Sequence, residues 1–303
     1  IRLITNLHEA VKKPDAMQGE PFWDDGVDLY LQAIFYYEWL ESIEESRTGS
    51  MNNILYLVNL ETQKMPDGET TRLQLEMDKL AKRKGDFYPP VRDYRKLKEG
   101  ATETVRSIII MVNAMLKLCE TAGVKRIFEG DDIQIRELGT GVGGTAEHPT
   151  DCKIALFLVL PDNDRSYNFL ISIFYTQAFD ILMRMADNEY HGPLPIPVEF
   201  WMDEFYAGAK PTDPDVLLGV VRSRNICMMP VLQSVSQIKT LFKNDKWETM
   251  LDNCETLLYL GSGPGALSTH KYISELLGKM TIDTRHDGRS MGRNGSTSEN
   301  YQQ

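Results

Sequence analysis

The sequence predicts an α/β protein in which an all-helical unit interrupts a doubly wound parallel sheet. Two observations carry this prediction. Short apolar runs alternate with helical patterns after about residue 126, and no strand pattern occurs between residues 21 and 125. The 303 residues have room for two domains or for one large domain with an insertion. We expect residues 1–20 to belong to the α/β side, residues 21–125 to form an all-α domain, and residues 126–303 to form the main α/β domain.

Apolar residues at helical spacing predict the helical unit. Pro21 and Asp24 suit a helix start, and the apolar pattern that follows continues to Leu40. A polar break is expected at 41–50. Further helical patterns cover 51–64, 69–84 and 101–119.

Four short apolar runs are predicted as strands buried on both faces, as in a parallel sheet. Asp213 and Pro214 suit the N-cap and first position of a connecting helix. Pro230 removes a hydrogen-bond donor inside the third strand, so we expect a bulge there. The polar residues 283–303 predict a flexible tail or an incomplete edge of the domain. The predicted strands are 154–160, 198–202, 226–232 and 255–260, and the predicted helices are 166–186, 213–224, 234–251 and 267–277.

Charge and cysteine usage narrow the class of protein. The net charge of −11 argues against a general basic nucleic-acid binder but allows local basic patches. Four scattered cysteines without a CxxC pair argue against a structural zinc site, and Cys119, Cys227 and Cys254 are predicted as buried free thiols in a reducing compartment. No apolar run approaches the ~20 residues that span a bilayer. The start at Ile1 lacks an initiator Met and a signal peptide, which we interpret as an excised piece.

An acidic pair at the end of the second predicted strand is the sharpest chemical signal. Asp203 and Glu204 follow the apolar run directly, which is the Walker B arrangement of P-loop motors. In that interpretation Asp203 holds Mg²⁺ through water, because Mg²⁺ prefers octahedral oxygen ligands, and Glu204 orients the attacking water. Ligands of parallel α/β sheets bind at this carboxyl end. The alternative is an acidic pair without function in a loop.

Two further features lie near the next strand. Gln233 follows the third predicted strand and is a candidate sensor of a terminal phosphate or of the attacking water. Arg222 and Arg224 precede that strand, and either one is a candidate arginine finger that stabilises charge on a neighbouring subunit's phosphate. Alternatively, the two arginines only form a solvated helix end, where positive charge suits the helix dipole.

Several segments together resemble the TraG/TraD-type (VirD-like) coupling proteins of conjugation and type IV secretion. They occur in family order and span nearly the whole chain. The segments are PFWDDGVDLYLQAIFYY at 21–37, YPPVRDYRKLKEGATETVRSII at 88–109, KIALFLVLPDNDRSYNFLISIFYTQ at 153–177, LPIPVEFWMDEFYAG at 194–208, VVRSRNICMMPVLQSVSQIK at 220–239, DNCETLLYLGS at 252–262 and YISELLGKMTI at 272–282.

The resemblance implies a RecA-like P-loop NTPase sheet, incomplete in this chain, with an inserted all-α domain. It implies an ATPase that uses ATP and Mg²⁺, forms a ring of six copies at the cytoplasmic face of the bacterial inner membrane, recruits a relaxase–DNA complex, and drives DNA into the type IV secretion channel. By position, Asp203 and Glu204 match the family's Walker B residues, Gln233 its glutamine, and Arg222 or Arg224 its arginine finger.

The sequence departs from the family pattern at the phosphate-binding loop. No GxxxxGK[ST] motif occurs, and the glycine-rich stretch 139–144 lacks the Lys and Ser/Thr, so we interpret it as a surface loop. The resemblance places the phosphate loop and membrane helices before residue 1 and a last strand after residue 303. We therefore expect this soluble, cytoplasmic piece to bind ATP poorly and to be inactive alone.

A basic and aromatic cluster in the helical unit suggests a second function. Basic residues interleaved with aromatic ones suit single-stranded DNA, but we favour a solvated helix face with inward-packed aromatics for so short a cluster. A substrate-docking module for relaxase or single-stranded DNA, without ATPase activity, is thus one alternative function, and another RecA-like DNA translocase is a second. The cluster comprises Lys82, Arg83, Lys84, Phe87, Tyr88, Arg92, Tyr94, Arg95, Lys96 and Lys98.

Overall fold

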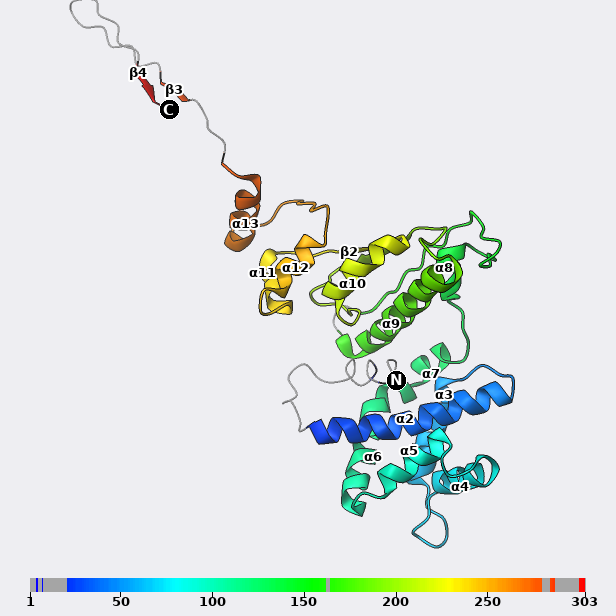
Figure 1. The fold of residues 1–303 in the computed structure, drawn as a ribbon. Helices are drawn as coiled ribbons and strands as arrows, with labels where there is room; N and C mark the ends of the chain where they lie inside the picture. Colours follow the sequence, from blue (N-terminus) through cyan, green and yellow to red (C-terminus); the bar gives the residue numbers. More distant parts are fainter. Residues whose placement is uncertain are drawn as a thin grey trace, which may run out of the picture. The chain divides into compact units, whose positions relative to one another are not determined.

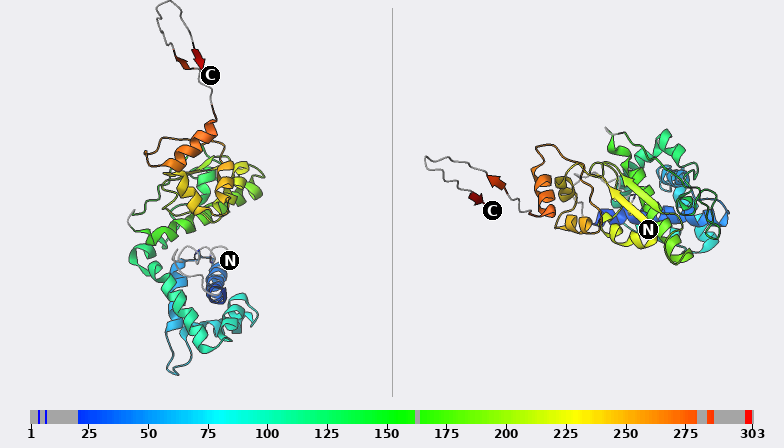
Figure 2. Two further views of the ribbon diagram at one scale, coloured as in Figure 1. Left: turned by 90° about the vertical axis from the view of Figure 1, so that its left-hand side faces the viewer. Right: turned by 90° about the horizontal axis from the view of Figure 1, so that it is seen from above.

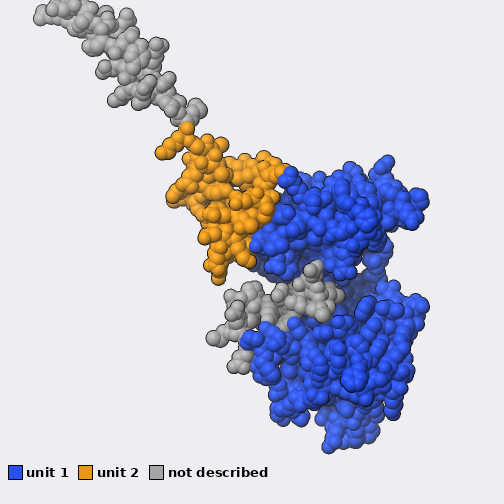
Figure 3. All heavy atoms as spheres, in the orientation of Figure 1, with its two compact units in different colours: residues 1–230 blue, residues 231–303 orange. Residues whose placement is uncertain are grey.

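A computed structural model describes Ile4, Leu7 and residues 21–161, 164–279, 284–286 and 300–302. The chain divides into two compact units, residues 1–230 and residues 231–303, which are coloured separately in Figure 3. The first unit contains the helical region and a parallel strand pair, and the second contains three short helices and an antiparallel strand pair.

Every named element between Pro21 and Ile127 is helical (Figure 1). Helix α2 packs against α3, α5 and α6, and its residues Tyr30 and Leu31 are fully buried in the main hydrophobic cluster. Ile4 and Leu7 belong to the same cluster. The boundaries of the predicted domains stay a prediction. The helices are α2 (Pro21–Glu44), α3 (Met51–Thr62), α4 (Arg72–Lys84), α5 (Pro89–Lys98), α6 (Thr102–Leu116) and α7 (Ala122–Ile127), with a 3₁₀ turn, η1 (Lys117–Glu120), before α7.

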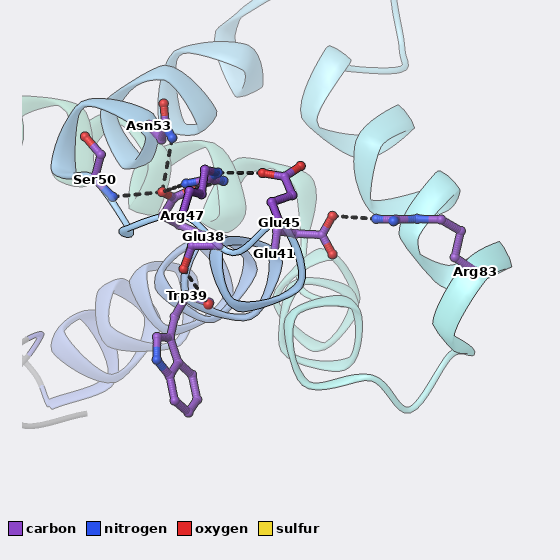
Figure 4. A network of polar contacts seen from close by, with 9 residues as sticks. Glu38, Trp39, Glu41, Glu45, Arg47, Ser50, Asn53 and Arg83 are labelled. Carbon is purple, nitrogen blue, oxygen red and sulfur yellow. Dashed lines mark hydrogen bonds and ion pairs between the residues drawn. The ribbon is translucent and has the colours of Figure 1, made fainter.

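Helix α2 continues four residues beyond the expected break at residue 41, because buried polar contacts hold its last turn. Glu38 accepts two hydrogen bonds from Arg47, at 2.5 and 3.0 Å, and one from the Ser50 backbone N–H at 2.8 Å (Figure 4). The Asn53 amide donates to the same carboxylate at 3.1 Å. One turn further on, Glu41 accepts from Arg83 of α4 at 2.5 Å. Glu38 and Glu41 therefore attach the last turns of α2 to the rest of the fold, where the sequence predicted a break.

Two parallel strands form the sheet of the first unit. Strand β1 (Val198–Met202) pairs with β2 (Ile226–Pro230) in a continuous register from Val198↔Ile226 to Met202↔Pro230, and Figure 2 shows them side by side. The register is continuous, so the bulge expected at Pro230 does not form. Pro230 is the last residue of β2, and its missing N–H therefore interrupts little of the hydrogen-bond ladder. The helices of this part are α8 (Ile135–Thr140), α9 (Asn168–Arg184) and α10 (Pro214–Val221), with 3₁₀ turns η2 (Arg165–Tyr167) and η4 (Arg222–Arg224) and a π turn, η3 (Met185–Glu189).

One face of this strand pair is buried and the other is exposed. Phe200 of β1 packs against Phe179 of α9, with ring centroids 4.5 Å apart. On the opposite face Trp201 is 69 % exposed, and Glu199 and Cys227 are exposed as well. The predictions that the strands are buried on both faces and that Cys227 is a buried thiol are therefore wrong for this structure. Nothing described covers the second face of the pair.

Two of the four predicted strands do not form. Residues 153–160 and 255–260 have no strand pairing, and their apolar side chains point into solvent: Phe157 is 84 % exposed and Leu260 is 87 % exposed. A strand satisfies its backbone only through neighbouring strands, unlike a helix, so an apolar run without a neighbour stays irregular. Asp213 and Pro214 take the predicted N-cap and first helical positions of α10, but the Asp213 side chain accepts no capping hydrogen bond and its backbone is left-handed.

In the second unit, the single helix expected over 234–251 is divided in two. Helices α11 (Val235–Leu241) and α12 (Lys246–Asp252) are separated by Asn244 and Asp245, which both have left-handed backbone angles. Helix α13 (Leu267–Leu277) matches its predicted range. Strands β3 (Thr284–His286) and β4 (Asn300–Gln302) pair antiparallel within the predicted tail, whose other residues from 283 on lie outside the described ones.

One helical stretch, Arg165–Glu189, passes a test for membrane spans on length and composition alone. That test is weak evidence, because core helices pass it too. The contact of Phe179 with Phe200 shows that α9 is a core helix of this fold.

Candidate functional site

The acidic pair lies directly after β1, at the carboxyl end of the parallel pair. Asp203 and Glu204 are both exposed, and the Asp203 carboxylate accepts the Glu204 backbone N–H at 3.0 Å. Glu204 has a left-handed backbone with φ of 51°, which is uncommon for a residue other than glycine. The structure thus presents two carboxylates to solvent at the sheet edge where ligands of α/β folds bind.

A tight turn follows the acidic pair and is held from several sides. The Glu204 carbonyl accepts the backbone N–H groups of Ala207 at 2.9 Å and Gly208 at 2.8 Å. Phe205 is 1 % exposed and anchors the turn in the core. The Lys210 ammonium donates to the carbonyls of Tyr206 at 3.0 Å and Gly208 at 2.9 Å.

Lys210 is the titratable group near the acidic pair whose pKa is clearly displaced. Burial lowers the pKa of its ammonium to about 8, and the positive charge of Arg165 lowers it further. Desolvation acts in this direction because a low-dielectric environment disfavours the charged form of a lysine. At neutral pH the group remains protonated and donates to the turn.

The two candidate arginine fingers have different environments. Arg224 is bound bidentately to Asp187 of the π turn, at 2.8 and 2.9 Å, and also donates to the Val220 carbonyl at 2.6 Å. Arg222 is exposed at the start of η4. Arg224 therefore holds the turn before β2 in place through its bonds to Asp187 and Val220.

Gln233 comes three residues after β2 and belongs to the second unit. Its backbone N–H donates to the Gln237 side chain at 2.9 Å, and the two side-chain amides are 3.4 Å apart. The first turn of α11 thus orders Gln233 locally. Its convergence with Asp203 and Glu204 stays a prediction.

The glycine-rich stretch 139–144 comprises the last two residues of α8 and the tight turn that follows. The Gly143 N–H already donates to the Glu137 carboxylate at 3.1 Å. A Cβ on Gly141 would approach the Thr150 carbonyl to 2.3 Å, and its φ of 84° also favours glycine. Close packing at Gly141 and Gly144 and a left-handed backbone at Gly143 account for these glycines, and the N–H groups of residues 141–144 already donate within the protein.

Acidic neighbours neutralise much of the basic cluster. Arg83 pairs with Glu41, Lys84 with Glu44, Arg92 with Asp93 and Arg95 with Asp86. Lys82 and Lys96 are exposed, and Phe87, in the turn between α4 and α5, is 90 % exposed.

Tyr94, predicted as a DNA-stacking residue, lies in the core instead. It is 2 % exposed and donates its hydroxyl to the buried Glu61 carboxylate at 2.7 Å. Lys98 donates to the same carboxylate at 3.1 Å. Tyr88 is half-buried at the start of α5. These contacts favour the interpretation of the cluster as a helix face with inward-packed aromatics. Partner binding by its exposed members stays a prediction.

Sequence reasoning missed two residues near the candidate site. Asp187 gave no signal because it lies just after a predicted helix and far in sequence from its partner Arg224. Lys210 is a single lysine in a loop, and only the structure shows that it points back at the turn after the acidic pair.

Comparisons with known proteins agree with this arrangement. Residues 197–303 match the family model described as "TraM recognition site of TraD and TraG". The fold is similar to the unbound monoclinic form of the bacterial conjugative coupling protein TrwBdeltaN70, with a TM-score of 0.57 and 14 % identity over 99 % of this chain and 60 % of that one. It is similar to plasmid coupling protein TrwB in complex with the GTP analogue GDPNP, with a TM-score of 0.57 and 15 % identity over 91 % of this chain and 57 % of that one. No curated protein matches the chain.

The fold is therefore similar to that of these two solved coupling proteins, in line with the fold class that the resemblance implied. The family match over residues 197–303 agrees with the resemblance of that part of the chain to the TraG/TraD-type coupling proteins. The chain spans 60 % and 57 % of the lengths of the two solved proteins.

Proposed function

We propose that this chain is the greater part of the cytoplasmic motor of a conjugative coupling ATPase. The intact protein would act at the cytoplasmic face of the bacterial inner membrane. Its resemblance to the coupling proteins implies a ring of about six copies. It would recruit a relaxase–DNA complex and drive single-stranded DNA into a type IV secretion channel. The observation that carries this proposal is the acidic pair, Asp203 and Glu204, at the carboxyl end of a parallel strand pair.

The residues at this edge fit the ion and nucleotide that the fold implies. Two exposed carboxylates offer the oxygen ligands that Mg²⁺ prefers, and Mg²⁺ commonly takes its remaining ligands from water and phosphate oxygens. In the intact protein ATP supplies the phosphoryl group whose transfer to water releases the energy for transport.

Each side chain has a separate role in the proposed mechanism. Asp203 holds the Mg²⁺ environment through water. Glu204 orients the attacking water and accepts its proton. Arg222, which is exposed, reaches toward the phosphate bound by a neighbouring copy, while Arg224 stays with Asp187 and positions the η4 turn. Gln233, which follows β2, would respond to the presence or loss of the terminal phosphate and transmit that change to α11.

A docking function is the second candidate, and the family match supports it. Residues 197–303 match a domain described as a recognition site for TraM, so this part of the chain would bind a relaxosome protein. The exposed members of the helical cluster, Lys82, Lys96 and Phe87, would then contribute to substrate contact. The intact protein can combine docking with ATP hydrolysis.

Replacing Glu204 by Gln in the full-length protein tests the motor function. The change keeps the size of the side chain but removes the proton acceptor, so we expect DNA-stimulated ATP hydrolysis to fall at least about 100-fold. Glu199→Gln is the matched control, because Glu199 is exposed on the same strand but precedes the acidic pair. Equal hydrolysis by the Glu204 variant and the wild type would remove Glu204 from the mechanism.

A further inference from the structure

The turn that carries the acidic pair has an unfavourable backbone. Glu204 is left-handed, with φ of 51°, and a side chain other than glycine adopts this conformation only when surrounding contacts enforce it. The N–H groups of Ala207 and Gly208 both fold back onto the Glu204 carbonyl. The carbonyls of Tyr206 and Gly208 therefore point away from the turn's own hydrogen bonds and need another donor.

Lys210 supplies that donor, although its surroundings disfavour the charged form of its ammonium. Its ammonium bonds the Tyr206 and Gly208 carbonyls at 3.0 and 2.9 Å and lies 5.7 Å from the centre of the Phe205 ring. Burial and the positive charge of Arg165 both lower the pKa of its ammonium, and no carboxylate among the described residues offsets either effect. Burial of a lysine without a counter-charge disfavours its protonated form, so the gain must come from the turn that it holds.

The link from Lys210 to the acidic pair is short and rigid. Phe205 follows Glu204 directly and is fixed in the core, and Gly208 is joined both to the Glu204 carbonyl and, through its own carbonyl, to Lys210. Asn168 of α9 adds a weaker contact, at 3.4 Å, to the Ala207 carbonyl. A loss of the lysine would therefore free the part of the turn that sets the direction of the Glu204 side chain.

We propose that Lys210 is the positioning residue of the acidic pair. Its ammonium joins the Tyr206 and Gly208 carbonyls and so holds Asp203 and Glu204 in place at the end of β1. The lysine touches no reacting atom. The inference rests on the proposed function for its catalytic consequence, but the effect on the turn can be measured without any activity.

The test compares Lys210→Met, Lys210→Arg and Lys79→Met in the full-length protein. Methionine keeps the length of the side chain but donates nothing, arginine keeps the donors, and Lys79 is an exposed lysine of α4 that serves as the matched control. Amide hydrogen exchange at Ala207 and Gly208 reports on the turn. ATP hydrolysis is measured as kcat and KM separately, with Glu204→Gln as the reference for a lost proton acceptor.

We expect Lys210→Met to raise exchange at Ala207 and Gly208 about tenfold, because two hydrogen bonds from a charged donor are lost. We expect kcat to fall on the order of 100-fold with KM little changed, since a small misplacement of a catalytic group acts on the chemical step. Lys210→Arg should recover most of both effects, and Lys79→Met should show neither.

Two results would overturn the proposal. One is unchanged exchange in Lys210→Met, which would mean that the lysine does not hold the turn. The other is raised exchange with unchanged kcat while Glu204→Gln abolishes hydrolysis, which would reduce Lys210 to a structural brace. If Glu204→Gln itself leaves hydrolysis intact, the proposed function fails, and the exchange measurement still decides whether Lys210 holds the turn.

Discussion

The helical region and the strand-forming segments differ in where their backbone hydrogen bonds are satisfied. Helices α2 to α7 close their hydrogen bonds within each helix, and their apolar faces meet in a shared core. The apolar runs 153–160 and 255–260 have strand composition but no pairing, whereas β1 and β2 form because each has the other. A helix thus satisfies its backbone hydrogen bonds within itself, whereas a strand needs a neighbouring strand to satisfy them.

Hydrogen exchange should show the largest difference between the two regions. Amides of residues 154–160 make no backbone hydrogen bond in the described structure, whereas those of α2 are held in a buried helix. We expect exchange at least about a thousandfold faster in 154–160 than at Leu31 and Ile34, since core amides open only with the cooperative unit. Comparable protection of the two segments would mean that residues 154–160 find a strand partner in solution.

The helical region should be sensitive to its buried ion pair. Arg47→Met removes the partner of Glu38, whose side chain is 4 % exposed, and leaves a buried carboxylate with only the Ser50 and Asn53 donors. We expect the free energy of unfolding to fall by about 2 kcal/mol, because a buried charge loses its compensation. Urea unfolding followed by helical circular dichroism measures it.

Arg106→Met is the control for that substitution, because Arg106 is an exposed arginine of α6. It should change the free energy of unfolding by less than about 0.5 kcal/mol. Equal effects of the two variants would mean that the Glu38 pair contributes nothing beyond an ordinary surface contact.

A smaller effect is expected from pH. Burial alone would raise the pKa of Glu38, but hydrogen bonds from Arg47, Ser50 and Asn53 outweigh it and hold that pKa below the ordinary glutamate value. A carboxyl whose pKa is lower in the folded state stabilises the fold above the unfolded pKa, about 4.3, and this contribution is lost as the pH falls through the folded value. Glu38→Gln should therefore lose less stability than the wild type on acidification below about pH 4. Parallel curves for both proteins would contradict this assignment.

The sequence predicted local features better than those that need distant partners. The helix 267–277 and the strand 198–202 match their expected ranges, because apolar spacing within a few residues determines both. The acidic pair was found because it directly follows a strand. The inward packing of Tyr94 was one of two interpretations of the cluster, and the sequence did not identify its partner Glu61, which is distant along the chain. Lys210 and Asp187 were missed for the same reason.

The account depends most directly on whether three side chains meet at one nucleotide. A crystal structure of the full-length protein with Mg²⁺ and a non-hydrolysable ATP analogue would measure this. We expect the Glu204 carboxylate and the Gln233 amide within hydrogen-bond reach of the terminal phosphate or its water, about 3 Å, and Asp203 joined to Mg²⁺ through water. A nucleotide bound elsewhere, with Asp203, Glu204 and Gln233 far apart, would contradict the motor function.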